Sequence, residues 1–129
     1  MAIIKVDYGT IGGGITSNIL MLFTTSANGL SKNDFYNEEL LTYVSGTISN
    51  VSGKFDATFT SNVKGTIDIF MDNADNAGGT SVYINGTIVC NVSASPYYHN
   101  ETGIPINIGD TVRIQSTAYY ADIVIKYNE

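Results

Sequence analysis

Short apolar alternations, each ended by a turn sequence, recur along most of this 129-residue chain. Phe55, Ala57 and Phe59 are alternate residues of one such segment, and Thr66–Asp72 repeats the pattern. A period of two places successive side chains on opposite faces of a β-strand. Strands at intervals of roughly 8–12 residues, separated by Gly- and Asn-containing turns, are typical of sandwiches. The pattern predicts an all-β fold, an antiparallel β-sandwich of jelly-roll type.

The sharpest turn signal is Asn85-Gly86, which lies between β-branched and aromatic residues. Such a dipeptide is preferred in a two-residue type I′ turn, because both central positions require φ > 0. The expected register of this hairpin pairs Tyr83 with Ile88 and Val82 with Val89.

Three segments depart from plain strand alternation. Ser31–Leu41 is the one segment that allows a short helix, and its sequence leaves helix and non-helix open. Pro105 interrupts an alternation of isoleucines and cannot donate a backbone hydrogen bond, so it predicts an edge strand. Tyr97–Asn100 follows Ser-Pro and is expected to be a loop.

Three consecutive glycines, residues 12–14, separate the first residues from the rest of the chain. Because glycine runs are unfavourable inside regular elements, they predict a Gly-rich N-terminal arm. We expect an arm over residues 1–14 and a single sandwich domain over residues 15–129. The arm is expected to dock on a neighbouring molecule through its apolar side chains, which are Ile3, Ile4, Val6 and Tyr8.

Composition excludes several classes of protein. Charged residues make up 14% of the chain, the net charge is −6 and hydrophobic residues make up 43%. An acidic chain lacks the basic surface of a nucleic-acid binder, and the apolar fraction is too high for a disordered chain. The longest apolar run is far shorter than the roughly 20 residues of a membrane helix, and residues 1–8 lack a signal-peptide pattern. We expect no nucleic-acid or membrane partner, and synthesis in the cytoplasm.

Residues with catalytic or metal-binding chemistry are few. The single cysteine, Cys90, is expected in the core, and the single histidine, His99, at the surface or in an interface. Asp56 and Asp68 are expected on the outward faces of adjacent strands, where aspartates most often only contact water. Asp72 and Asp75 offer oxygen ligands for calcium, although the spacing does not fit an EF-hand. The sequence predicts no enzyme, no cofactor and no metal, with Asp72 and Asp75 as weak calcium candidates.

Aromatic and amide groups gather in two short stretches near the C-terminal end. Sugars stack on aromatic rings and hydrogen-bond to amides, whereas tyrosines are also common in subunit interfaces. Both interpretations stay open for the residues concerned, which are Tyr97, Tyr98, Asn100, Tyr119 and Tyr120.

Two parts of the chain resemble known proteins. The opening Met1–Gly9, followed by Gly12–Gly14, resembles the start of small virion proteins of tailed phages and prophages of gut Firmicutes. Ile108–Ile114, followed by the apolar strand at residues 121–125, is similar to the late Gly-Asp hairpin of trimeric jelly rolls. These include tumour-necrosis-factor-like heads and phage fibre and decoration domains.

The resemblance implies a structural virion protein that decorates the capsid or forms a head or tail accessory. Its expected partners are itself, as a homotrimer, and the major capsid or other virion proteins. The alternative is a carbohydrate-binding module of a phage fibre that attaches to a host-surface glycan. A complete fibre has a shaft as well, and no such segment is present in these 129 residues.

Overall fold

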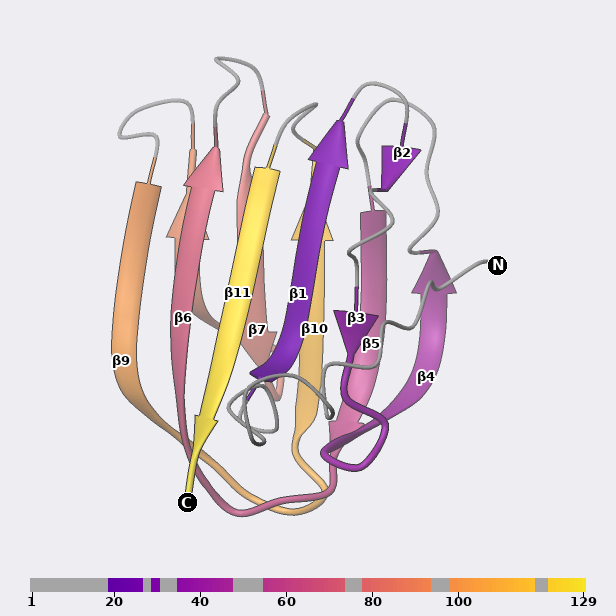
Figure 1. The fold of residues 1–129 in the computed structure, drawn as a ribbon, viewed down its shortest axis with the longest axis vertical. Coiled ribbons are helices and arrows are strands. Elements are labelled where there is room, and N and C mark those ends of the chain that lie inside the picture. Colours follow the sequence, from indigo (N-terminus) through magenta and orange to yellow (C-terminus); the bar gives the residue numbers. More distant parts are fainter. Residues whose placement is uncertain are drawn as a thin grey trace, which may run out of the picture.

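The structure, a computed structural model, describes residues 19–26, 29–30, 35–47, 55–73, 78–93, 98–117 and 121–129. In these ranges the chain forms eleven strands and no helix. The strands make two antiparallel sheets that pack face to face, so the predicted all-β sandwich is confirmed (Figure 1). The expected arm, residues 1–14, lies outside the described residues.

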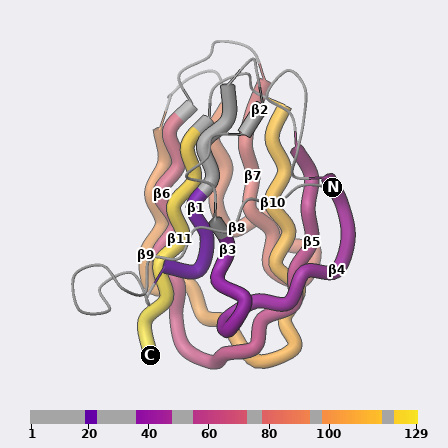
Figure 2. Tube along the Cα trace, turned by 45° about the vertical axis from the view of Figure 1, so that its right-hand side comes forward, coloured from indigo at the N-terminus to yellow at the C-terminus, as the bar shows by residue number. Residues whose placement is uncertain are grey.

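The first sheet has six strands in the order β2-β1-β11-β6-β9, with β3 also paired to β1. Its strands are β1 (Ile19–Ser26), β2 (Gly29–Leu30), β3 (Phe35–Tyr36), β6 (Gly65–Asn73), β9 (Tyr98–Ile106) and β11 (Ala121–Asn128). The second sheet has the order β4-β5-β10-β7-β8. Its strands are β4 (Leu41–Thr47), β5 (Phe55–Ser61), β7 (Thr80–Ile84), β8 (Thr87–Val92) and β10 (Thr111–Ser116). Figure 2 shows the two sheets as separate layers.

The core lies between the sheets and follows the predicted alternation. Buried and half-buried residues alternate along the whole of β5. Phe59 is fully buried, with its ring centroid 5.0 Å from that of Tyr36 and 5.8 Å from that of Tyr43. Burying a phenylalanine side chain stabilises the fold by about 1.5–3 kcal/mol. The inward residues of β6, β10 and β11 complete this core: Ile67, Ile69, Met71, Val112, Ile114, Ile123 and Ile125.

The connections from β5 to β6 and from β9 to β10 pass from one sheet to the other at the lower end in Figure 1. The turn between β5 and β6 is fixed by Ser61, whose hydroxyl donates to the Val63 carbonyl at 2.8 Å. The backbone N–H of Gly109, in the turn after β9, donates to the Ser61 carbonyl at 2.8 Å. Because β5 and β6 lie in different sheets, the expectation that Asp56 and Asp68 sit on adjacent strands is wrong.

The β7–β8 hairpin forms at Asn85-Gly86 as predicted, with φ of 51° and 83° at the two turn residues. Tyr83 lies opposite Ile88, which confirms half of the expected register. Val82 lies opposite Cys90 rather than Val89, because a bulge between Val82 and Tyr83 shifts the ladder by one residue.

No helix forms in the described part of Ser31–Leu41, which is residues 35–41. Instead β3 pairs with β1, and the backbone N–H of Asn37 donates to the Leu20 carbonyl at 2.9 Å. Asn37 then closes a turn, because its side-chain oxygen accepts from the Glu39 N–H and its carbonyl accepts from the Leu41 N–H. Strand pairing and the Asn-centred turn therefore prevail over helix formation.

The strand that contains Pro105 lies at the edge of the first sheet, as the proline predicts. Ile106 is buried, whereas Ile108 lies in the turn after the strand and is exposed. This strand, β9, begins at Tyr98, so the expectation that residues 98–100 form a loop is wrong. Residues 98–100 extend the strand because their backbone pairs with β6, with Tyr98 opposite Asp72 and Asn100 opposite Phe70.

Candidate functional site

Outward side chains of β6, β9 and β11 surround a hollow of about 270 Å³ on the exposed face of the first sheet. We call it the first-sheet hollow. Two rows of residues in register, together with Met71, line it. One row is Tyr98, Asp72 and Asp122, and the other is Asn100, Phe70 and Val124. The hollow thus combines an apolar floor with polar and acidic groups.

The apolar part of the first-sheet hollow is accessible to a partner. Tyr98 is 66% exposed, although it lies in a regular strand. Phe70 and Val124 are only half-buried, in central strands of the sheet. The Lys126 ammonium lies 5.5 Å from the centroid of the Phe70 ring, within the range of a cation–π contact.

The acidic part of the first-sheet hollow is a cross-strand pair of like charges. Asp72 and Asp122 are directly opposite each other on β6 and β11, and both are exposed. Like charges in this position destabilise a sheet, so a group that donates hydrogen bonds to both carboxylates relieves the repulsion. The arrangement can hold a hydroxyl-rich ligand or a basic side chain of a partner.

The structure brings together three of the residues singled out from the sequence, namely Tyr98, Asn100 and Asp72. Tyr97, Tyr119, Tyr120 and Asp75 lie outside the described residues, as do Ile3, Ile4, Val6 and Tyr8. Sequence reasoning missed Phe70, Asp122 and Val124. The available signal was Phe70, a large aromatic residue at an outward position of the Thr66–Asp72 alternation. Asp122 and Val124 reach this site only through the pairing of β11 with β6, and no short sequence pattern predicts that pairing.

The outer face of the second sheet is covered by a polar network instead. Arg113 donates two hydrogen bonds to Asp56, from Nε at 2.9 Å and from Nη2 at 2.7 Å. Its guanidinium lies 5.0 Å from the Tyr83 ring centroid, and the Tyr83 hydroxyl donates to Gln115 Oε1 at 3.1 Å. The hydrogen bond from Arg113 lowers the pKa of Asp56. These four side chains thus satisfy one another on the outer face.

Asp56 and Asp68, which the sequence places on outward faces of strands, are each hydrogen-bonded within their own sheet. The Gly103 N–H donates to Asp68 Oδ1 at 2.9 Å. This hydrogen bond, followed by that from Asn128, lowers the pKa of Asp68. Because Asp56 and Asp68 lie on the outer faces of different sheets, they do not form a carboxylate pair across one cleft.

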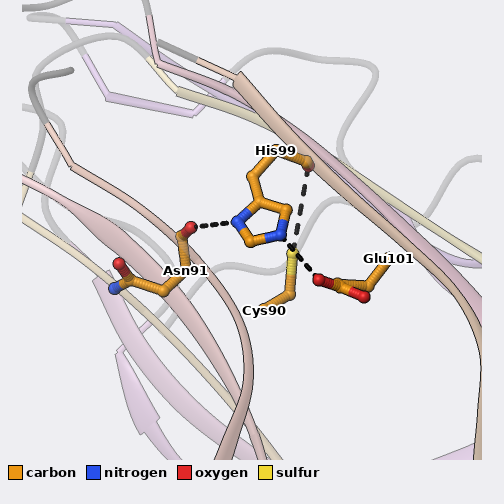
Figure 3. Close-up of polar contacts among 4 residues, drawn as sticks. All are labelled: Cys90, Asn91, His99 and Glu101. Carbon is orange, nitrogen blue, oxygen red and sulfur yellow. Dashed lines mark hydrogen bonds and ion pairs between the residues drawn. The ribbon is translucent and has the colours of Figure 1, made fainter. Parts of the chain in front are cut away.

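Cys90, His99 and Glu101 meet where the edge strands β8 and β9 face each other (Figure 3). The Cys90 side chain is buried in the core, as expected, and burial raises the pKa of its thiol to about 11. Its sulfur lies 3.9 Å from the backbone carbonyl of His99 and is not bonded to the imidazole ring. A nucleophilic cysteine needs a lowered pKa and a base on its sulfur, so this cluster does not have that geometry.

Neither a metal centre nor a membrane-spanning helix is found in the described part of the chain. No three His, Cys, Asp or Glu side chains gather there as ligands for a metal ion. No helix there is long and apolar enough to cross a membrane.

The sequence matches no protein-family model and no curated protein. Among solved structures, the chain is similar to pika GITRL, with a TM-score of 0.50 and 10% identity, over 86% of this chain and 98% of that one. It also aligns with 14% of a GH31 α-xylosidase from Xanthomonas citri, over 84% of this chain, at 10% identity and a TM-score of 0.40, which is too low to carry an argument. GITRL is a jelly-roll β-sandwich of the tumour-necrosis-factor family. This chain has the same general fold, a jelly-roll-like sandwich of two antiparallel sheets.

Proposed function

We propose that this chain is a non-enzymatic structural protein of a tailed-phage virion and that it works as an oligomer. The observation that supports association is the contrast between the two outer faces. In the second sheet, hydrogen bonds connect polar groups around Arg113, and the exposed Val44 and Ile88 lie apart on opposite edge strands. On the first sheet, Phe70, Val124 and Tyr98 line one hollow and are partly or largely exposed. Contiguous apolar surface of this kind marks interaction sites on soluble proteins.

The occupant of the first-sheet hollow is a neighbouring copy of this chain. Aromatic residues are enriched in the buried centres of protein interfaces, and Tyr98 and Phe70 are both available. The subunit number, three, comes from the resemblance of residues 108–125 to trimeric jelly rolls. The virion role comes from the resemblance of residues 1–14 to small phage proteins.

The mass of the protein in solution tests the association. We expect about three times the chain mass of 13.8 kDa by light scattering. Val124→Glu places a third carboxylate beside Asp72 and Asp122 and is expected to give monomers. Thr60→Glu is the matched control, because Thr60 is also half-buried on the outer face of a strand, but in the second sheet. Circular dichroism verifies that both variants fold. A wild-type monomer at the highest soluble concentration contradicts the proposal.

The arm is tested separately in phage particles. Deleting residues 1–14 is expected to abolish incorporation of the protein into virions while leaving the solution mass unchanged. A single exchange within the arm, Ile4→Asp, is expected to weaken incorporation, because Ile4 is one of the four apolar docking residues. Normal incorporation of the deletion variant rules out docking through the arm.

A carbohydrate-binding module of a phage fibre is the second candidate, and the lining of the first-sheet hollow favours it. The exposed Tyr98 ring lies near the Asn100 amide and the carboxylates of Asp72 and Asp122. A few convergent polar groups around an apolar surface are what a sugar site requires. A glycan array distinguishes the candidates. Binding lost in Tyr98→Ala and kept in Thr111→Ala supports the module, and an array without binders excludes it for the glycans tested.

A further inference from the structure

The His99 imidazole bridges the two sheets at one edge of the sandwich. The edge strands of the two sheets, β9 and β8, lie side by side there. His99 projects from β9 toward β8, and its Nδ1 lies 2.7 Å from the backbone carbonyl oxygen of Asn91 (Figure 3). Its Nε2 lies 2.7 Å from Oε1 of Glu101, two residues along the same strand. The ring therefore links one sheet to the other.

Both partners of the ring accept hydrogen bonds. A carbonyl oxygen has no proton to donate, and an ionised carboxylate has none either. A neutral imidazole carries one N–H and can satisfy only one of them, whereas an imidazolium donates to both. At 2.7 Å from either oxygen, an unprotonated ring nitrogen would place its lone pair against an oxygen lone pair, which is repulsive. The geometry therefore favours a ring that is protonated at both nitrogens.

We propose that His99 is a proton-operated clasp: as an imidazolium it donates to Glu101 on its own strand and to the Asn91 carbonyl of β8, and on losing a proton it keeps its one N–H on the carboxylate, the stronger acceptor, and releases Asn91. The proton is exchanged directly with solvent, since 38% of the His99 side chain is exposed. The clasp concerns a single chain and does not depend on the proposed function.

The surroundings of the ring agree with a charged imidazole. Among the described residues, β9 contributes the Glu101 carboxylate, β8 contributes the Cys90 thiol, and β6 contributes the uncharged Met71 opposite His99. Glu101, followed by the Asn91 carbonyl, raises the pKa of His99 above the ordinary histidine value. Burial keeps Cys90 neutral at the pH at which His99 titrates, because its pKa is raised to about 11.

The sign of the pH dependence follows from the raised pKa. A group whose pKa is higher in the folded than in the unfolded chain stabilises the fold fully below its unfolded pKa. That stabilisation is lost as the pH rises through the folded pKa. Because both side chains are well exposed, solvent screening keeps the effect modest. The same contribution is expected to act locally on the edge strands, because the contact with Asn91 joins β9 to β8 and is the one released.

The first measurement is an NMR titration of the His99 ring in the folded chain and in the same chain unfolded in urea. We expect a higher pKa in the folded chain. In Glu101→Gln, which keeps the shape and removes the charge, the folded pKa is expected to fall toward the unfolded one. A folded pKa at or below the unfolded value overturns the clasp, and so does a Glu101→Gln titration identical to wild type.

The second measurement is hydrogen exchange of the backbone amides of β8 and β9, corrected for the intrinsic effect of pH. Protection in these strands is expected to decrease as the pH rises through the folded pKa, and to become independent of pH in His99→Gln. Asp56→Asn is the matched control, because it removes the other described ion pair, between β5 and β10, and is expected to keep the wild-type response. Protection that does not change with pH in wild type overturns the proposal.

Discussion

Arg113 and Asp56 form a two-pronged ion pair on the outer face of the second sheet, with N–O distances of 2.9 and 2.7 Å. They are diagonal neighbours, because Arg113 lies opposite Thr58 and Asp56 opposite Gln115. The planar guanidinium matches the carboxylate at both nitrogens, which makes the geometry specific. The pair therefore fixes the centre of the polar network that distinguishes this face from the first-sheet hollow.

Removing this ion pair is expected to have a small effect that depends on pH. The pKa of Asp56 is lowered in the folded chain, so its contribution is present above the unfolded pKa and is lost as the pH falls through the folded pKa. Since both side chains are 40–48% exposed, Asp56→Asn is expected to cost about 0.5–1 kcal/mol at pH 7. Urea unfolding of wild type and Asp56→Asn at pH 7 and pH 3 measures this difference in the free energy of unfolding. A difference between wild type and variant that persists unchanged at pH 3 contradicts the assignment.

Gly46 allows β4 to approach β5 closely at its pairing with Ala57, just after the bulge between Tyr43 and Ser45. Its φ is 108°, and a Cβ there would collide with the Asp56 carbonyl oxygen and lie 2.7 Å from the Cα of Ala57. We expect Gly46→Ala to destabilise the fold by about 3 kcal/mol, from backbone strain and the collision together. Gly109→Ala is the matched control, with φ of 91° and open space around the added atom. It is expected to cost about 1 kcal/mol. If urea unfolding gives the same loss of stability for Gly46→Ala and Gly109→Ala, the backbone around Gly46 shifts to accommodate the added Cβ and the prediction is wrong.

The sequence predicts which residues of a strand face inward but not which strand lies beside it. Alternation is local, so the inward positions of β5 and β6 follow directly from the spacing of Phe55 and Ile67. Strand partners are set by long-range contacts between distant parts of the chain. No local pattern therefore shows that Asp56 and Asp68 lie in different sheets. The first-sheet hollow has the same origin, because Asn100, Phe70 and Val124 are neighbours only through long-range register.

Cys90 is expected to be unreactive in the folded protein. Its side chain is 2% exposed, and burial raises the pKa of the thiol to about 11. At pH 8 the thiolate, which is the reactive form, is then a very small fraction. Addition of a chromogenic disulfide reagent should give no reaction with native protein and one thiol per chain in urea. Rapid, complete modification without denaturant would show that the strands around Cys90 open easily.

Phe59 and Tyr98 represent two opposite settings of an aromatic residue, one in the core and one in the candidate site. Phe59 is fully buried between the rings of Tyr36 and Tyr43, so Phe59→Ala is expected to destabilise the fold by about 3–5 kcal/mol. Phe59→Leu, which fills most of the volume, is expected to cost about half as much or less. Tyr98 is 66% exposed, and Tyr98→Ala is expected to change stability by about 0.5 kcal/mol or less.

Thermal or urea unfolding of the three variants measures these differences under conditions in which wild type and variants have the same oligomeric state. Dilution below the association range is needed for Tyr98→Ala, because an interface that covers Tyr98 would add its own stabilisation to the wild type. A large loss for Tyr98→Ala that disappears on dilution assigns the residue to an interface. A large loss that persists in the monomer contradicts its position on the open face of the first sheet and places its ring in the fold itself.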